Sequence, residues 1–526
     1  MKEGKKKTSQ QTYRTLFWVG LACITGFRLL FIGKFGLGVD ESHYLLYSRH
    51  LAWGYFDHPP MVAFLAALTT LLGDSVFFVR LGPVLCSVIS LILLRYLALA
   101  LYRDERVALW AMLLLHLMPY QHLLLVGLLP DAVLNIFWCG TLLAVWRALQ
   151  TGKWSMWILA GLLFGGALLS KYHAVLLALC LLGYFITSPE HRFWLRRIQP
   201  YVAVVLGLAV FGPNIIWNVR HGWISYAYQL GQGGGDGLDP GKFLAGVAGQ
   251  AGAWSPIIFG LLIAVVVVMV RQKKTCEADR FAAWTSMPIF ALFCLIGLTS
   301  SILPHWTSAG WWTGSIVVSA VISQKLSFRN PTAGRWRRWS VAAAVTGFIM
   351  TAMVYLALFL PITAPVYTWA RDISLGLNRK FPAIKPLKPF ETGFDPANEL
   401  FGWQNIARQV ENIRAQMPRP ANTFVFGHRF HTSSQLAVYL DPDTAATSLY
   451  HRYSQYRLWF NAEDYTGWDA LFVVDRKRHQ ERARRYKSLF TKMDPQPKEI
   501  QVFRNGRPAH VMEVYKYYGF KGKYEE

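Results

Sequence analysis

The sequence predicts a polytopic α-helical membrane protein that ends in a soluble α/β domain. Of its 526 residues, 53% are hydrophobic and only 16% are charged, whereas a soluble protein carries about 25% charged residues. Apolar windows of about 20 residues recur between residues 15 and 360, and that length crosses the hydrocarbon core of a bilayer as a helix. Residues 361–526 contain no such window. We therefore expect a membrane domain over 1–360 and a soluble domain over 361–526.

We expect about eleven membrane spans, within a range of about ten to thirteen. They are residues 15–33, 76–101, 107–125, 131–149, 155–170, 174–187, 200–217, 254–270, 283–301, 307–323 and 339–360. Short basic segments lie between them, and all of these can face the cytoplasm together with the N-terminus. An odd number of spans then places the C-terminal domain outside, in the periplasm if the protein is bacterial.

The formal net charge of +24 favours lipid partners over nucleic acid. The basic residues lie between apolar segments, as they do on the cytoplasmic side of membrane proteins, and they suit lipid phosphates. The six cysteines show no metal-ligand spacing. The first apolar stretch, 16–32, follows four lysines but has no persuasive cleavage site, so we expect an uncleaved first span.

Three segments do not fit a simple helix bundle: the first outer loop, the loop 218–253 and the tail 361–526. The first outer loop, 34–75, is rich in polar and aromatic residues, and its apolar part, 60–72, is too short to span and is expected to lie in the interface or to be re-entrant. The loop 218–253 contains the glycine-rich stretch 231–237, which we interpret as a flexible lid.

The tail has the pattern of an α/β domain. Segments 423–427, 470–475 and 500–504 are expected to be strands, and 398–415 and 433–440 are expected to be helices. This part of the sequence contains no cysteine, so the domain must be stabilised by its own core.

An acidic pair, Asp40 and Glu41, opens the polar part of the first outer loop. A carboxylate just beyond a helix end can act as a general base for an acceptor hydroxyl. The same pair suits the start of an amphipathic helix over 41–52, where it would cap the helix. The residues alone favour neither interpretation, and the two are compatible.

Other ionisable residues stand at predicted span ends on the same outer face. Arg80 could bind a phosphate in a bidentate manner, but on the residues alone we favour snorkelling to the headgroups for Arg80, and more strongly for Arg28. Asp131 suits a helix cap. Lys171 contradicts the positive-inside bias, which favours a phosphate partner. His305 could hold a metal, orient a phosphate or be solvated.

At these residues the chain resembles a known family. Asp40-Glu41-Ser-His43-Tyr, followed by Gly-Tyr-Phe-Asp57-His58-Pro-Pro, is similar to the first outer loop of bacterial family 39 glycosyltransferases, relatives of protein O-mannosyltransferases and lipid A aminoarabinose transferases with the GT-C fold. The likeness continues through the segments 79–83, 129–132, 169–173 and 303–306, and in the tail through 426–428 and 434–436.

The resemblance implies a role for each matching residue. Asp40 would be the catalytic base, with Glu41 beside it. The donor phosphate would be bound by Arg80, Lys171, His58 and Tyr172. Asp131, His173 and His43 would have substrate-binding or structural roles. Asp57 matches an acidic position that in some relatives helps to bind a metal or the donor phosphate, so Asp57 and His305 could hold a divalent metal. His58 stands where aminoarabinose transferases have lysine, which makes aminoarabinose a less favoured sugar.

The function implied is transfer of a sugar from a polyprenyl phosphate, with inversion, at the outer face of the bacterial inner membrane. The acceptor hydroxyl could belong to lipid A, another glycolipid, a glycan or a protein. The main alternative is a transporter or flippase for a lipid-linked sugar, which should show two related halves with broken helices. A non-catalytic assembly or sensor protein is a second alternative. The sequence identifies neither the sugar nor the acceptor.

Overall fold

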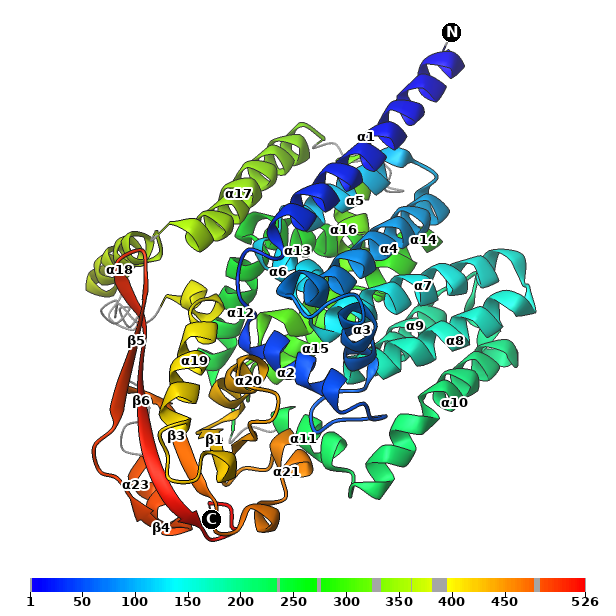
Figure 1. Ribbon diagram of the computed structural model, residues 1–526. Coiled ribbons are helices and arrows are strands. Elements are labelled where there is room, and N and C mark those ends of the chain that lie inside the picture. The colour runs from blue at the N-terminus through cyan, green and yellow to red at the C-terminus, as the bar shows by residue number, and fades with distance from the viewer. Residues whose placement is uncertain are drawn as a thin grey trace. The chain divides into compact units, whose positions relative to one another are not determined.

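The computed structural model describes residues 2–233, 237–271, 276–323, 333–360, 362–380, 395–476 and 483–525. The chain forms two compact units. Unit 1 comprises Met1–Gly33 and Leu51–Ala352, and unit 2 comprises Lys34–His50 and Met353–Glu526. Figure 1 shows helices throughout the blue-to-green part of the chain and the strands of a sheet in the yellow-to-red part.

Unit 1 is helical in its described residues. Its α-helices are α1 (Lys2–Phe31), α3 (Met61–Thr70), α4 (Val76–Tyr102), α5 (Glu105–His116), α6 (Pro119–Val126), α7 (Pro130–Thr151), α8 (Trp154–Ser170), α9 (Val175–Thr187), α10 (Gln199–Arg220), α11 (Ile224–Gly233), α12 (Pro240–Trp254), α13 (Pro256–Arg271), α14 (Glu277–Trp284), α15 (Met287–Ile296), α16 (Ser308–Ile322) and α17 (Ala333–Phe359), which continues into unit 2. Short 3-10 helices are η1 (Tyr172–Ala174), η2 (Arg192–Arg196) and η3 (Pro304–Thr307).

The polytopic membrane fold is confirmed. Among the described residues, six helical segments are long and apolar enough to cross a bilayer, or up to eight if two bent pairs, α5–α6 (90°) and α12–α13 (109°), each count as one span. Every predicted span overlaps a helix or helix pair, but α8 and the η1–α9 segment are shorter than a full span. The count of eleven therefore stays a prediction.

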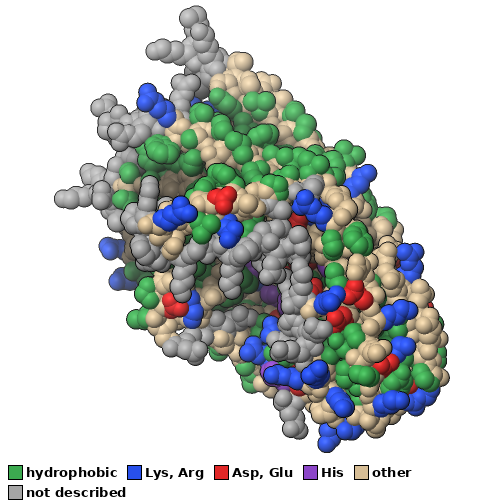
Figure 2. Space-filling view, turned by 90° about the vertical axis from the view of Figure 1, so that its left-hand side faces the viewer, with side chains coloured by type: hydrophobic (Ala, Val, Ile, Leu, Met, Phe, Trp, Pro, Cys, Tyr) green, Lys and Arg blue, Asp and Glu red, His purple; other side chains and the backbone are tan. Residues whose placement is uncertain are grey.

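The outer surfaces of these helices are apolar. Leu30, Leu179 and Val205 have exposed fractions of 71%, 58% and 64%, and hydrophobic side chains gather over the upper part of the face shown in Figure 2. Exposed apolar area of this extent would be costly in water and is expected where lipid covers the helices.

Small residues let α8 pack tightly against α10. Gly161 and Gly165 lie one turn apart on α8, and a Cβ atom on Gly161 would meet the carbonyl oxygen of Ala203 at 2.5 Å. A Cβ atom on Gly165 would meet Val210 at the same distance. Lipid gives helices no hydrophobic reason to associate, so close backbone contact of this kind supplies the packing energy.

The predictions for the loops 34–75 and 218–253 agree with the structure to different extents. The apolar stretch 60–72 forms the ten-residue helix α3, which agrees with its being too short to span. The loop 218–253 contains α11 and α12, so most of it is helical. The stretch 231–237, interpreted as a lid, lies partly outside the described residues.

Unit 2 contains an α/β fold, as predicted for the tail. Its elements are α2 (Val39–Arg49), α18 (Thr363–Lys380), η4 (Pro396–Leu400), α19 (Trp403–Arg414), β1 (Thr423–Gly427), α20 (Phe430–Tyr439), β2 (Ala446–Ser448), α21 (Gln455–Trp459), β3 (Asp469–Asp475), α23 (Ala483–Tyr486), β4 (Phe490–Met493), β5 (Lys498–Arg504) and β6 (Arg507–Phe520). The three predicted strands and two predicted helices are confirmed within a few residues.

The sheet has strand order β2-β1-β3-β6-β4, and β5 also pairs with β6. β1 is parallel to β2 and β3, and all pairs of β6 are antiparallel. Asn505 and Gly506, both with positive φ, form the tight turn that joins β5 to β6. Successive side chains of β1 point to opposite faces of the sheet. Val425 packs with α19 and α20 on one face, and Phe424 and Phe426 pack with α23 on the other.

Residues 34–50 complete unit 2, although more than 300 residues separate them from the rest of it. On α2, Ser42 Oγ donates to Gln435 Oε1 of α20 at 3.0 Å. Gln435 Nε2 donates in turn to the carbonyl oxygen of Leu37 at 2.8 Å, and Arg49 donates to the carbonyl oxygen of Ala437 at 2.9 Å. The units thus divide the chain differently from the predicted domains 1–360 and 361–526, because the start of the first outer loop is part of unit 2.

Candidate active site

A buried ion pair forms the centre of the polar residues in unit 1. Lys171, which follows α8, places Nζ at 3.0 and 2.8 Å from the two carboxylate oxygens of Asp131, in the first turn of α7. Ser308 Oγ donates to the same carboxylate at 2.6 Å. The side chains of Lys171 and Asp131 are only 5% and 3% exposed. The N-cap of α7 is Leu129, with no side-chain cap, so the expectation that Asp131 caps this helix is wrong.

Two histidines, His173 and His305, lie within electrostatic reach of this pair, and both also lie within electrostatic reach of His58. The ring of His305, in η3, lies parallel to the ring of Tyr120 with their centroids 6.4 Å apart. Burial, and after it the positive charge of Lys171, lowers the pKa of His305 to about 3. His305 is therefore a neutral imidazole at neutral pH, able to donate one hydrogen bond and accept another.

The segment that carries Asp57 and His58 is held by its backbone. Gln229 Nε2 of α11 donates to the carbonyl oxygen of Asp57 at 2.6 Å, and Ser225 Oγ donates to that of Tyr55 at 2.7 Å. The N–H of Tyr55 donates to the carbonyl oxygen of His58 at 3.0 Å, which closes a tight loop. Helix α11, which precedes most of the stretch predicted to be a lid, therefore fixes the position of the Asp57–His58 loop.

Tyr172 lies beside this loop, within electrostatic reach of Asp57. Its hydroxyl is 3.5 Å from Asn218 Nδ2 of α10, and its ring packs edge-on against Tyr226 of α11. The phosphate-binding role that the resemblance implies for Tyr172 stays a prediction.

The two arginines expected to snorkel are buried instead. Arg28 is 2% exposed, and its guanidinium donates to Ser87 Oγ at 3.0 Å and lies 3.1 Å from His116 Nε2. Arg80 is 5% exposed and donates to the carbonyl oxygen of Ile32 at 2.9 Å. Snorkelling is therefore wrong for both, because each guanidinium bonds to partners within the helix bundle.

In unit 2, the structure separates the roles of the acidic pair on α2. Glu41 is 4% exposed, and its Oε2 accepts the backbone N–H of Gly38 at 2.9 Å, so it caps the helix. Asp40, its neighbour, is exposed. His43 is buried, hydrogen-bonds to the hydroxyl of Tyr47 at 2.9 Å and packs against Phe430. The cap expected of the pair is thus supplied by Glu41, and Asp40 presents its carboxylate on the surface of unit 2.

The residues do not fit the divalent metal that the resemblance suggests. In the part of the chain that the structure describes, no group of three or more His, Cys, Asp or Glu side chains is placed to hold a metal ion. Asp57 and His305 therefore have no third protein ligand there. The chemistry developed below uses no metal.

The structure brings His58, Asp131, Lys171, His173 and His305 together in unit 1, and it places Asp40, Glu41 and His43 on α2 in unit 2. Sequence reasoning missed Ser308, which follows the Pro-His-Trp motif by two residues, and Gln229. Neither belongs to a recognisable motif, and only the fold shows their contacts.

The matching family is described as dolichyl-phosphate-mannose-protein mannosyltransferase, and its model matches residues 57–217. That segment includes Asp57, His58, Arg80, Asp131 and Lys171. A sequence relative is the lipid A galacturonosyltransferase RgtD of Rhizobium johnstonii, 26% identical over 288 residues. The match spans 53% of this chain and 59% of that relative. These likenesses confirm the resemblance to family 39 glycosyltransferases.

Solved structures confirm the GT-C fold. ArnT from Cupriavidus metallidurans bound to undecaprenyl phosphate superposes with a TM-score of 0.60 at 16% identity, over 95% of this chain and 98% of that one. The archaeal oligosaccharyltransferase AglB from Archaeoglobus fulgidus gives a TM-score of 0.50 at 9% identity, over 88% and 70%. The chain is thus a multi-pass membrane protein with the GT-C fold.

Proposed function

We propose that the protein is a membrane glycosyltransferase that moves a sugar from a polyprenyl-phosphate donor to an acceptor hydroxyl at the outer face of the inner membrane. The likeness to RgtD and to the mannosyltransferase family supports a transferase. An ArnT with the same fold binds undecaprenyl phosphate, which supports a lipid-linked donor. In this proposal the N-terminus is cytoplasmic and unit 2 is periplasmic. Nothing in these relatives supports the flippase alternative.

The observation that carries the proposal is the buried Asp131–Lys171 pair within the segment that matches the family. Ionisable groups among membrane helices are costly and are usually functional. A lysine ammonium has three N–H donors, and in the described chain two of them bond to Asp131. The third is available to a phosphate oxygen of the donor. Ser308 holds Asp131 in place, and Asp131 in turn fixes the direction in which this third N–H of Lys171 points.

In the proposed reaction each residue has the role that its chemistry suits. The acceptor oxygen attacks the anomeric carbon on the side opposite the phosphate, which inverts that centre. The bond from the anomeric carbon to the phosphate oxygen breaks, and its electron pair leaves with the polyprenyl phosphate. Lys171 and Arg80 stabilise the negative charge that develops on this leaving group. Asp40 accepts the proton of the acceptor hydroxyl.

The test is the substitution Asp40→Asn, which keeps the shape of the side chain and removes its basicity. We expect transfer from a polyprenyl-phosphate sugar by the purified protein to fall by about 10²- to 10⁴-fold, the usual contribution of a general base. Thermal stability should not change because Asp40 is exposed. Asp74→Asn, at another exposed aspartate, is the matched control. Turnover of D40N within threefold of wild type would refute the assignment.

The orientation is tested separately. Protease added to spheroplasts of a bacterium that expresses the protein should cleave unit 2 and leave the N-terminal segment intact. Cleavage only after the inner membrane is lysed would contradict the proposed topology.

A further inference from the structure

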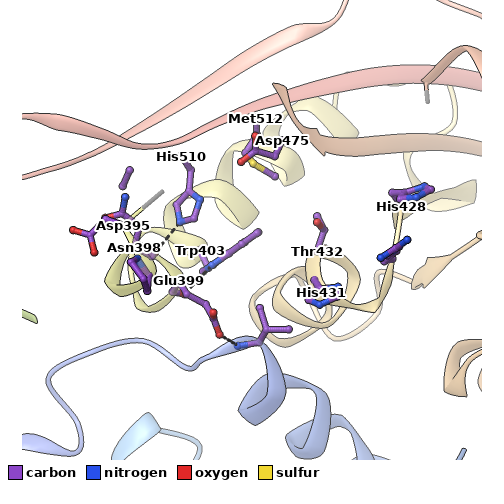
Figure 3. Close-up of a pocket in the computed structure, with 14 residues that line it drawn as sticks. Asp395, Asn398, Glu399, Trp403, His428, His431, Thr432, Asp475, His510 and Met512 are labelled. Carbon is purple, nitrogen blue, oxygen red and sulfur yellow. Dashed lines mark hydrogen bonds between the residues drawn. The ribbon is translucent and has the colours of Figure 1, made fainter. Parts of the chain in front are cut away.

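Unit 2 contains a cavity of about 510 Å³, separate from the residues assigned above (Figure 3). Its walls come from η4 and α19, from the residues after β1, from the end of β3 and from β6. The polar lining residues are Asp395, Asn398, Glu399, His428, Arg429, His431, Thr432, Asp475 and His510. A volume of this size accommodates a small ligand or one or two sugar rings, since ligand pockets are typically about 300–1,000 Å³.

The cavity lies where the topology of the sheet opens a crevice. β2 and β3 flank β1 on opposite sides, and all three strands are parallel. After β1 the chain enters α20, whose Leu436 packs on one face of the sheet. After β3 it reaches α23, whose Tyr486 packs on the other face. Parallel α/β sheets bind ligands at such a switch point, beyond the carboxyl ends of the strands.

The turn after β1 is shaped tightly around this crevice. A Cβ atom on Gly427 would lie 2.8 Å from Cβ of Thr432 and 2.9 Å from the backbone nitrogen of Ser433. Glycine therefore lets the first turn of α20 fold against the strand end. That turn directs His428 and Thr432 to the cavity wall (Figure 3).

The lining selects for a ligand that is rich in hydroxyl groups. Three carboxylates, Asp395, Glu399 and Asp475, line the cavity, and Arg429, which also lines it, can pair with an anionic group on the ligand. Carboxylates accept strong hydrogen bonds from hydroxyls, and the amide of Asn398 can both donate and accept. Trp403 and Met512 supply an apolar wall for the C–H face of a ring. These are the contacts that a saccharide requires.

The cavity is joined directly to the start of α2. Glu399 Oε1 accepts the backbone N–H of Val39 at 2.7 Å, and Val39 itself lines the cavity (Figure 3). The next residue is Asp40. We propose that this cavity binds the saccharide of the acceptor, next to the helix that carries the proposed base. The inference rests on the proposed transferase function and names the acceptor class as a glycan or glycolipid.

The test measures binding by the full-length protein in lipid nanodiscs without a donor, so it does not depend on transfer. The probes are lipid A and its deacylated disaccharide. The variant combines Thr432→Val and Asp475→Asn, which remove a hydroxyl and a charge at the cavity wall. Asp441→Asn, at an exposed aspartate that does not line the cavity, is the control. Thermal unfolding of each variant checks that unit 2 remains folded.

We expect the disaccharide to compete with lipid A on the wild-type protein, and the double variant to bind lipid A at least tenfold more weakly while D441N binds normally. The inference is overturned if the wild type binds neither probe, if the disaccharide does not compete, or if the folded double variant binds lipid A as the wild type does. Normal binding together with no transfer by the wild type from any polyprenyl-phosphate sugar would instead refute the proposed function.

Discussion

The pairing of Asp131 with Lys171 makes a quantitative prediction about stability. Lys171 Nζ bonds to both oxygens of Asp131, and both side chains are at most 5% exposed. Hydrogen bonds to charged groups contribute about 1.5–3 kcal/mol each. Removing one partner of such a buried pair also leaves an uncompensated charge, at a total cost of about 3–5 kcal/mol. We expect Asp131→Asn and Lys171→Met each to destabilise the protein by that amount.

The double variant should be much less destabilised than the sum of the two single variants. Once both charges are gone, no buried ion lacks a partner, so the coupling free energy should be at least about 2 kcal/mol. The assay is unfolding of the purified protein in detergent, followed by tryptophan fluorescence, for the wild type, both single variants and the double variant. Lys153→Met, at an exposed lysine just before α8, is the control and should not change stability.

Additivity within about 0.5 kcal/mol would refute the reasoning, because it would mean that the two charges do not depend on each other. A second measurement tests the role in donor binding. Undecaprenyl phosphate should raise the unfolding temperature of the wild type, as any ligand of the folded state does. It should raise that of the folded double variant less, and an equal rise in both would exclude Lys171 from the donor site.

Two further predictions concern buried groups in unit 1. Arg28→Met should destabilise the protein by about 3 kcal/mol, because it removes the hydrogen-bond partner of the buried Ser87 and His116 side chains. Arg14→Met, at an exposed arginine of the same helix, is the control and should have no effect in the same unfolding assay. The pKa of His305 is about 3 in the folded protein and about 6.5, its ordinary value, in the unfolded chain. As the pH drops from 6.5 towards 3, His305 is therefore protonated in the unfolded chain but not in the folded protein, and the free energy of unfolding falls. Between pH 7.5 and pH 5 the free energy of unfolding of the wild type should fall by up to about 2 kcal/mol more than that of His305→Gln, at about 1.4 kcal/mol per pH unit. Equal falls in the two proteins would contradict the lowered pKa of His305.

Much of the fold could be predicted because hydrophobic length and alternation are local signals. The strands at 423–427, 470–475 and 500–504 and the spans near 76–101 and 131–149 all match observed elements. The bend between α5 and α6 was missed, because the window 107–125 is apolar except for His116, Gln121 and His122, and only the 90° turn before Pro119 divides it. The long strand β6 was missed because its polar and aromatic residues alternate less regularly than those of a half-buried strand.

The candidate site was predicted in its members but not in its contacts. The motifs single out Asp131, Lys171 and His305, and these three lie within electrostatic reach of one another. No local pattern indicates that Asp131 bonds to Lys171 rather than capping its own helix, since this choice depends on how α7 and α8 pack. The burial of Arg28 depends in the same way on α4 and α5, which bring Ser87 and His116 to it.

Residues 34–50 belong to unit 2 but precede the rest of that unit by about 300 residues in the sequence, and this order has a consequence for biosynthesis. Helix α2 leaves the ribosome about 300 residues before Met353, where the rest of its unit begins. At a synthesis rate of about 5–20 residues per second, this segment waits roughly 15–60 s for its partners. On α2, the ring of His43 packs against Phe430 and the ring of Tyr47 packs against Trp459, so during that interval both side chains lack these partners. The hydrogen bonds of Gln435 to Ser42 and Leu37 can therefore form only after α20 has been synthesised.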